Sequence, residues 1–153
     1  MKTLVPLFSV LLALTRPAIA STPEEVAAPK YWEVAYGAGK KQKQIQARAS
    51  ITQAEARSYQ KLVLKKEGDV QPALFDQIFD QLQSLAKAEA EKVQKPSKKK
   101  IHCADPLVAR GNEGKDAFIF KTCIGKNNSV RQLLSALRKL EDGLPALKTS
   151  KKN

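Results

Sequence analysis

Apolar and polar residues alternate along the first part of the chain, as they do in β-strands with one buried face. Residues 31–36 alternate in this way and place Trp32 and Val34 on the inward side. The alternation returns at 44–51 and again at 59–66, and each stretch is long enough for one strand. The pattern therefore predicts three strands before the first helix.

The stretch between the second and third of these strands is ambiguous. Thr52-x-x-Glu55 has the spacing of a helical capping box, and alanine follows it closely. We expect 52–58 to form a short irregular or helical link, and a strand stays open as the alternative. Residues 67–69 (Glu-Gly-Asp) have the composition of a turn after the third strand.

Two later segments repeat apolar residues at helical spacing. The first begins at Pro72, a residue type that suits the first position of a helix, and runs to about Val93. The second is expected to begin at a Ser129 cap and to stop at Gly143, with Pro145 beyond it. Each segment carries one apolar stripe, so we expect each helix to pack against a sheet.

The region between the helices has the pattern of a β-hairpin over 101–124. Leu107 and Val108 lie on one arm, 118–120 lie on the other, and 111–114 (Gly-Asn-Glu-Gly) supply a tight turn. The order βββ-α-ββ-α predicts an α+β fold, a small two-layer sandwich with an antiparallel sheet of about five strands covered by two helices. The expected core consists of Trp32, Val34, Phe75, Ile78, Phe79, Leu82, Phe118, Phe120, Leu133, Leu134 and Leu137.

The first twenty residues have the features of a secretory signal peptide. Lys2 supplies a positive start, 3–15 form an apolar stretch, and 18–20 (Ala-Ile-Ala) form a small-x-small cleavage site. An uncleaved membrane anchor is the alternative, but the apolar run is shorter than the ~20 residues that span a bilayer. We expect the mature protein to begin at Ser21 and to be secreted or periplasmic.

The rest of the chain is divided by composition and charge. We expect a flexible lead-in at 21–30, one α+β domain at 31–145 and a basic disordered tail at 146–153. The chain holds 27 Lys and Arg against 15 Asp and Glu, and loss of Lys2 and Arg16 with the signal lowers its net charge from +12 to +10. Such a charge favours an acidic protein surface or another anionic macromolecule as partner.

Cys103 and Cys123 are the two cysteines of the chain, and an exported protein favours their pairing. They are equidistant from the middle of the expected 111–114 turn, so they should bridge the two arms of the hairpin. A metal pair and a redox couple are the alternatives, but no Cys-x-x-Cys is present. His102, the single histidine, points to the other side of a strand from its neighbour Cys103 and would not share an ion with it. No metal and no cofactor is expected.

Basic residues cluster in the expected turns and linkers. A solvated, solubilising surface explains them as well as a binding surface does. The candidate binding residues are Lys40, Lys41, Lys43, Lys98, Lys99, Lys100, Arg110 and Lys115, the last two at the hairpin tip.

The motifs of common hydrolases are missing from the sequence. It has neither Gly-x-Ser-x-Gly nor His-Glu-x-x-His, and its acidic residues are scattered. We therefore expect a non-enzymatic, exported, basic binding protein, such as a protein inhibitor or an envelope adaptor. An electrostatic ligand of anionic polysaccharide, lipid or nucleic acid is the first alternative. A small hydrolase whose site is assembled only by folding is the second.

Overall fold

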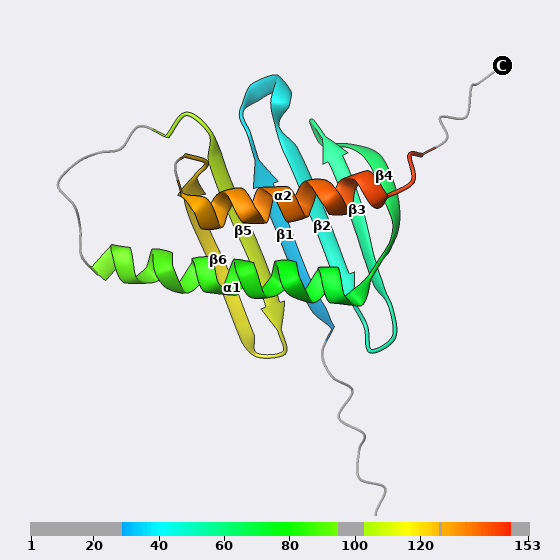
Figure 1. Cartoon of the computed structure of the whole chain (residues 1–153), viewed down its shortest axis with the longest axis horizontal. Helices are drawn as coiled ribbons and strands as arrows, with labels where there is room; N and C mark the ends of the chain where they lie inside the picture. Colours follow the sequence, from blue (N-terminus) through cyan, green and yellow to red (C-terminus); the bar gives the residue numbers. More distant parts are fainter. Residues whose placement is uncertain (1–28, 95–102, 126, 148–153) are drawn as a thin grey trace, which may run out of the picture.

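The computed structural model describes residues 29–94, 103–125 and 127–147 as one antiparallel sheet with two helices on one of its faces (Figure 1). The sheet has six strands in the order β4-β3-β2-β1-β5-β6. The elements are β1 (Lys30–Tyr36), the short 3-10 helix η1 (Gly39–Lys41), β2 (Lys43–Ala49), β3 (Ala54–Gln60), β4 (Val63–Val70), α1 (Pro72–Gln94), β5 (Pro106–Glu113), β6 (Asp116–Cys123) and α2 (Asn128–Gly143). The α+β prediction is therefore confirmed, with ββββ-α-ββ-α as the order.

The number of strands before α1 differs from the prediction. The expected link at 52–58 belongs mostly to β3, and the expected single strand at 59–66 spans the turn between β3 and β4. This turn is formed by Lys61 and Leu62, both with left-handed backbone (φ 49° and 64°). Neither residue is a usual turn former, because such a backbone favours Gly, Asn or Asp. The sequence thus gives no turn signal at the position where the chain reverses.

The expected turn at 67–69 is also wrong, because these residues lie inside β4. Gly68 is a strand residue against which the segment following α2 packs: a side chain there would lie 2.8 Å from a ring carbon of Pro145. Leu147 donates a backbone hydrogen bond to Lys65 (3.1 Å), and Ala146 bridges to Lys66. The chain after α2 therefore covers part of the β4 edge, which would otherwise present unpaired backbone groups.

The second hairpin turns later than predicted. Glu113 pairs with Asp116, so the turn is Gly114–Lys115, and Gly111 lies within β5. A Cβ atom on Gly111 would lie 2.6 Å from the ring of Phe118. The glycine is thus needed for close packing of this ring against the strand, and the turn needs only Gly114.

The core lies between the sheet and the two helices, and its predicted members are confirmed. All of them are buried except Phe118, which is partly buried against the others. Aromatic rings run through the layer, from Trp32 past Phe75 and Phe79 to Phe118, with neighbouring centroids 5.7–6.4 Å apart. The apolar stripe of each helix therefore faces the sheet, as its spacing predicts.

The ends of α2 differ slightly from the prediction. The cap is Asn127, whose side-chain oxygen accepts a hydrogen bond from the Ser129 backbone (2.9 Å), so Ser129 lies inside the helix. Gly143 ends the helix as expected, and the buried Leu144 follows it. Across the described residues, neither helix is both long and apolar enough to cross a membrane.

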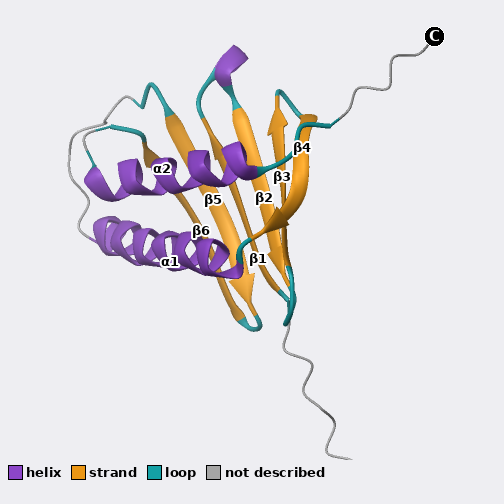
Figure 2. Cartoon of the chain, turned by 45° about the vertical axis from the view of Figure 1, so that its right-hand side comes forward, coloured by secondary structure: helices purple, strands orange, loops and turns teal. Residues whose placement is uncertain are grey.

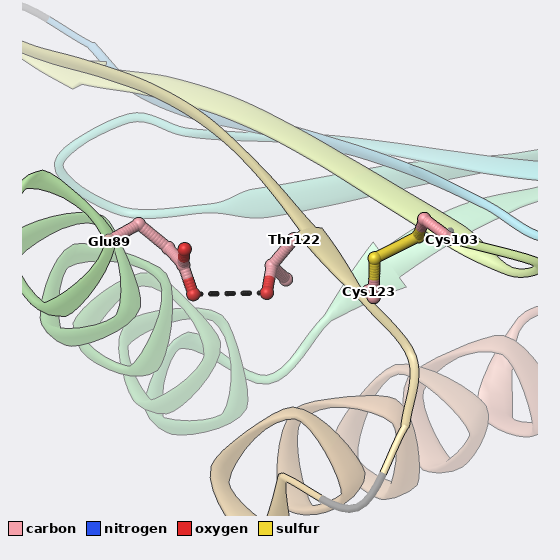
Figure 3. The surroundings of a disulfide bond; sticks show 4 residues. All are labelled: Glu89, Cys103, Thr122 and Cys123. Carbon is pink, nitrogen blue, oxygen red and sulfur yellow. Dashed lines mark hydrogen bonds between the residues drawn. A yellow bond between two sulfur atoms is a disulfide. The ribbon is translucent and has the colours of Figure 1, made fainter. Parts of the chain in front are cut away.

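The disulfide between Cys103 and Cys123 is present, close to the hydrogen bond from Thr122 to Glu89 of α1 (Figure 3). Its position differs from the expected symmetric one. Cys123 pairs with Pro106 in the β5–β6 register, and Cys103 lies three residues before Pro106. A bend at 104–105 brings Cys103 back to the sheet, where Ile124 donates a backbone hydrogen bond to Asp105 (2.8 Å). The bridge therefore ties the approach to β5 to the end of β6.

Candidate functional site: the open face of the sheet

Both helices lie over the same face of the sheet, and the part of the chain that the structure describes leaves the other face uncovered (Figure 2). We call this second face the open face. The strand register assigns it alternate residues of every strand, including the three β1 positions on either side of Trp32 and Val34. Its members are Tyr31, Glu33, Ala35, Gln44, Gln46, Arg48, Glu55, Arg57, Tyr59, Leu64, Glu67, Asp69, Pro106, Val108, Arg110, Asn112, Ala117, Ile119, Lys121 and Cys123.

Glu33 is the centre of a hydrogen-bond network on this face. It lies in the middle of β1, directly opposite Gln46 of β2 and Arg110 of β5. Its carboxylate accepts hydrogen bonds from Gln44 (2.8 Å) and Gln46 (3.3 Å). It also accepts from the Tyr31 hydroxyl (3.0 Å) and from Nε and an Nη of Arg110 (3.1 and 2.7 Å). Side chains of three strands are therefore bound to one carboxylate.

The network is partly shielded from solvent although it lies on a surface. The Glu33 side chain is only 12% exposed, because its partners cover it. Hydrogen bonds to this carboxylate raise the pKa of Arg110 above its ordinary value. Burial, followed by the hydrogen bond to Glu33, raises the pKa of Tyr31. Charge-assisted hydrogen bonds of this kind are stronger than neutral ones, so they fix the positions of the tyrosine ring and the guanidinium.

A hollow of about 550 Å³ opens beside this network. Its walls include Tyr31, Gln46, Arg48, Arg110 and Asn112 around Glu33. They offer guanidinium and amide donors, amide oxygens as acceptors and an aromatic ring. Such a set can bind a mixed polar surface, for example peptide groups and side chains of another chain.

An apolar strip adjoins the network on β5 and β6. Ile119 lies opposite Arg110, and its side chain is 76% exposed. Val108 is also exposed and lies opposite Lys121. The open face thus combines fixed polar groups with exposed aliphatic ones, which is the usual composition of a protein interface.

The structure separates the predicted binding residues. Lys40 and Lys41 lie exposed in η1 at one end of the sheet, while Lys115 lies in the β5–β6 turn at the opposite end (Figure 1). Arg110 is not at the hairpin tip, since it lies within β5 and pairs with Glu33. Lys98, Lys99 and Lys100 lie outside the described residues, as does His102. The five predicted positions that the structure describes therefore do not form one patch.

Lys43 has a structural role on the covered face. Its ammonium group pairs with Glu141 of α2 (2.8 Å), whose other carboxylate oxygen accepts from Ser58 (2.9 Å). Lys66 donates to the Glu141 backbone oxygen (2.8 Å). Burial raises the pKa of Glu141, but the hydrogen bonds from Lys43 and Ser58 outweigh it and the net pKa is lowered. Burial also raises the pKa of the neighbouring Tyr36 to about 12. This cluster fixes the end of α2 to β2, β3 and β4.

Glu33, Tyr31, Gln44 and Gln46 are not among the binding residues predicted from the sequence. A signal for them exists in the outward positions of the first two strands. Glu is depleted in strands, and a Glu at the middle of one, facing a Gln-x-Gln pair, indicates a polar network. That signal identifies a candidate site only when the strand register and the uncovered face of the sheet are known, because these show that the residues lie together and are accessible.

Groups that bind metal ions are not brought together in the described ranges. Within residues 29–94, 103–125 and 127–147, no three His, Cys, Asp or Glu side chains approach closely enough to hold an ion. Comparison with protein-family models, with curated proteins and with solved structures finds no match to this chain. The disulfide is compatible with an extracellular location.

Proposed function

We propose that this chain is an exported, non-enzymatic binding protein that recognises another protein through the open face of its sheet. The observation that carries the proposal is the network around Glu33, which fixes tyrosine, glutamine and arginine side chains on an uncovered face. Groups fixed before binding lose little conformational entropy when a partner docks, so their contacts contribute more to affinity.

The size of the open face suits such a role. Six strands at a spacing of ~4.8 Å and about seven residues at ~3.3 Å each give a surface of roughly 24 by 23 Å. The resulting area of about 550 Å² is somewhat smaller than the ~800 Å² that each partner contributes to a standard interface. Contacts at the rim would supply the remainder.

The charge of the open face favours a protein over a polyanion as partner. Arg48, Arg57, Arg110 and Lys121 are balanced there by Glu33, Glu55, Glu67 and Asp69. Much of the excess of positive charge falls outside the strands in the sequence, since 95–102, 126 and 148–153 contain eight lysines. A balanced face does not attract a polyanion over distance, whereas it can match a mixed surface through local pairs.

A capture experiment tests the proposal. The mature protein, residues 21–153, is immobilised and used to capture partners from the extracellular fraction of its source. Capture is carried out at about 0.1 M and at about 1 M salt, because the Debye length falls from ~10 Å to ~3 Å between these concentrations. The open-face variant is Arg48→Asp/Ile119→Asp. The matched control is Lys87→Asp/Val93→Asp on α1, because Val93 is as exposed as Ile119 (79% and 76%) and both variants change charge equally.

We expect the wild type and the α1 control to retain one partner at both salt concentrations, and the open-face variant to lose it. Equal retention by both variants would contradict the proposal. Capture that disappears for all three proteins at high salt would favour nonspecific electrostatic binding of a polyanion instead.

A further inference from the structure

Two hairpin tips lie side by side at the end of the sheet opposite Lys115 (Figure 1). One is formed by 38–42, within the loop between β1 and β2. The other is formed by 61–63, which are the two turn residues between β3 and β4 and the first residue of β4. The Lys61 backbone donates a hydrogen bond to the Gln42 oxygen (3.3 Å), so the two tips are joined. We call residues 38–42 and 61–63 together the paired tip.

The paired tip is strongly basic. Residues 37–43 and 60–66 contain six lysines and no aspartate or glutamate. Lys43 and Lys66 are engaged with Glu141, as described above. Lys40, Lys41 and Lys61 are exposed, and none of them forms an ion pair with any residue the structure describes.

The paired tip also exposes apolar side chains. Leu62 is 81% exposed, and its neighbour Val63 is exposed as well. Leu62 holds this position with a left-handed backbone that a leucine adopts at a cost in free energy, and Lys61 does the same. A glycine or asparagine at either position would make the same turn with less strain. A strained turn that presents a leucine next to an exposed lysine indicates a functional use for that leucine.

We propose that the paired tip binds an anionic lipid surface. Leu62 would enter the boundary between head groups and acyl chains, and Lys40, Lys41 and Lys61 would lie against the lipid phosphates. Lysine attracts such phosphates as a point charge without needing a shaped site. An anionic polysaccharide would be attracted by the lysines equally, but it offers no apolar phase for Leu62. The exposed leucine therefore favours lipid.

This binding mode is independent of the proposed open-face function and compatible with it. The tip lies at the end of the strands, so the sheet would stand on the lipid surface with its open face directed sideways (Figure 2). The partner site would then stay accessible. A basic exported protein would be concentrated at an anionic envelope while it binds its partner.

Vesicle sedimentation tests the inference with the mature protein. The vesicles contain phosphatidylglycerol and phosphatidylcholine in equal parts, and pure phosphatidylcholine vesicles serve as the uncharged reference. Leu62→Gly removes the apolar side chain and at the same time relieves the left-handed backbone, so this variant keeps its fold. Lys40→Gln/Lys41→Gln removes two charges, and Lys115→Gln at the opposite end of the sheet is the control.

We expect binding to the anionic vesicles only. The lysine pair variant should bind about thirtyfold more weakly, because each lysine near such a surface contributes ~1 kcal/mol. Leu62→Gly should bind roughly tenfold to a hundredfold more weakly, as expected for a leucine that loses its burial. Lys115→Gln should bind within about twofold of the wild type, since its charge is far from the surface.

Two results would overturn the inference. One is equal vesicle binding by Leu62→Gly and the wild type, which would mean that the leucine does not enter the lipid. The other is capture of dextran sulfate that Leu62→Gly weakens as much as it weakens vesicle binding. That result would mean that the leucine contributes without an apolar phase, and it would assign the tip to polysaccharide.

Discussion

Phe79→Ala is the substitution that tests the packing of α1 on the sheet. Phe79 is buried, with its ring 6.4 Å from Phe75 and 5.7 Å from Phe118, the latter in an edge-to-face arrangement. The Lys30 ammonium lies over the ring, 5.2 Å from its centroid. The substitution empties the centre of the aromatic row between α1 and β6.

The loss can be worked out from burial. An aromatic side chain buries ~150–250 Å², which at ~25 cal/mol per Å² contributes about 4–6 kcal/mol. Alanine keeps part of this area, so the free energy of unfolding should fall by about 3–5 kcal/mol, the range found for such core truncations. With a urea dependence of ~2 kcal/mol per M, the unfolding midpoint should shift by about 2 M.

Urea denaturation followed by tryptophan fluorescence measures this shift, since Trp32 lies 5.9 Å from Phe75 in the same core. Gln77→Ala, on the exposed side of the same helix, is the control and should stay within ~0.5 kcal/mol of the wild type. A double-mutant cycle with Phe118→Ala should give a coupling of about 0.5–1.5 kcal/mol. A loss below ~1 kcal/mol for Phe79→Ala would show that this face of α1 is not packed.

Three further predictions concern the bridge, the α2 cluster and a strand glycine. Cys103→Ser/Cys123→Ser should lower the free energy of unfolding by about 2–4 kcal/mol, because the unfolded chain is no longer cross-linked across a separation of 20 residues. The native protein, alkylated without reductant, should show no alkylated thiols by intact mass, and two alkylated thiols would refute the bridge. The lowered pKa of Glu141 contributes stability that is present above the ordinary pKa of 4.5 and is lost as the pH falls through the pKa of the folded state. Below about pH 5, the free energy of unfolding of Glu141→Gln should therefore depend less on pH than that of the wild type. Parallel pH dependences would contradict this. Gly111→Ala should lower the free energy of unfolding by about 1–3 kcal/mol, because the new Cβ atom would lie 2.6 Å from a ring carbon of Phe118 and 2.7 Å from the Tyr31 backbone oxygen. An unchanged midpoint in a denaturant melt would show that the ring moves aside freely.

The layers of the fold follow from the sequence because periodicity reports which side of an element is buried. Trp32 and Val34 alternate at a period of two, and Phe75, Phe79 and Leu82 recur at helical spacing; all of them are buried as predicted. These patterns result from burial itself, and each is carried by several residues. The predicted layers and core therefore agree with the structure.

Some strand boundaries do not follow from the sequence, because glycine, a usual turn residue, lies inside two of the strands. Gly68 and Gly111 lie inside strands, where Pro145 and Phe118 approach too closely for a side chain. The real turn at Lys61 and Leu62 lacks the residue types that mark turns. For both glycines a contact distant in the sequence determines the residue, and local chemistry cannot reveal it.

The candidate site does not follow from the sequence for a related reason. The charge clusters in the sequence predict a site made of lysines. In the structure, Lys40 and Lys41 lie in η1, Lys43 pairs with Glu141, and Lys115 lies at the opposite end of the sheet. The Glu33 network depends on which strands neighbour β1 and on both helices lying on one face. Both are properties of the assembled sheet. The alternating pattern of a single strand does not say whether its polar side is covered.

Chemical-shift mapping tests the open-face proposal most directly: the captured partner is added to the isotope-labelled mature protein, and the NMR signals of the labelled protein are followed. We predict that the amide signals of β1, β2 and β5, and the Arg110 side-chain Nε–H signal, shift on binding. The signals of the solvent-exposed sides of α1 and α2 should stay in place, because these helices lie on the other face of the sheet. Shifts confined to the helices, with the Arg110 signal unmoved, would contradict the proposal that the open face is the binding surface.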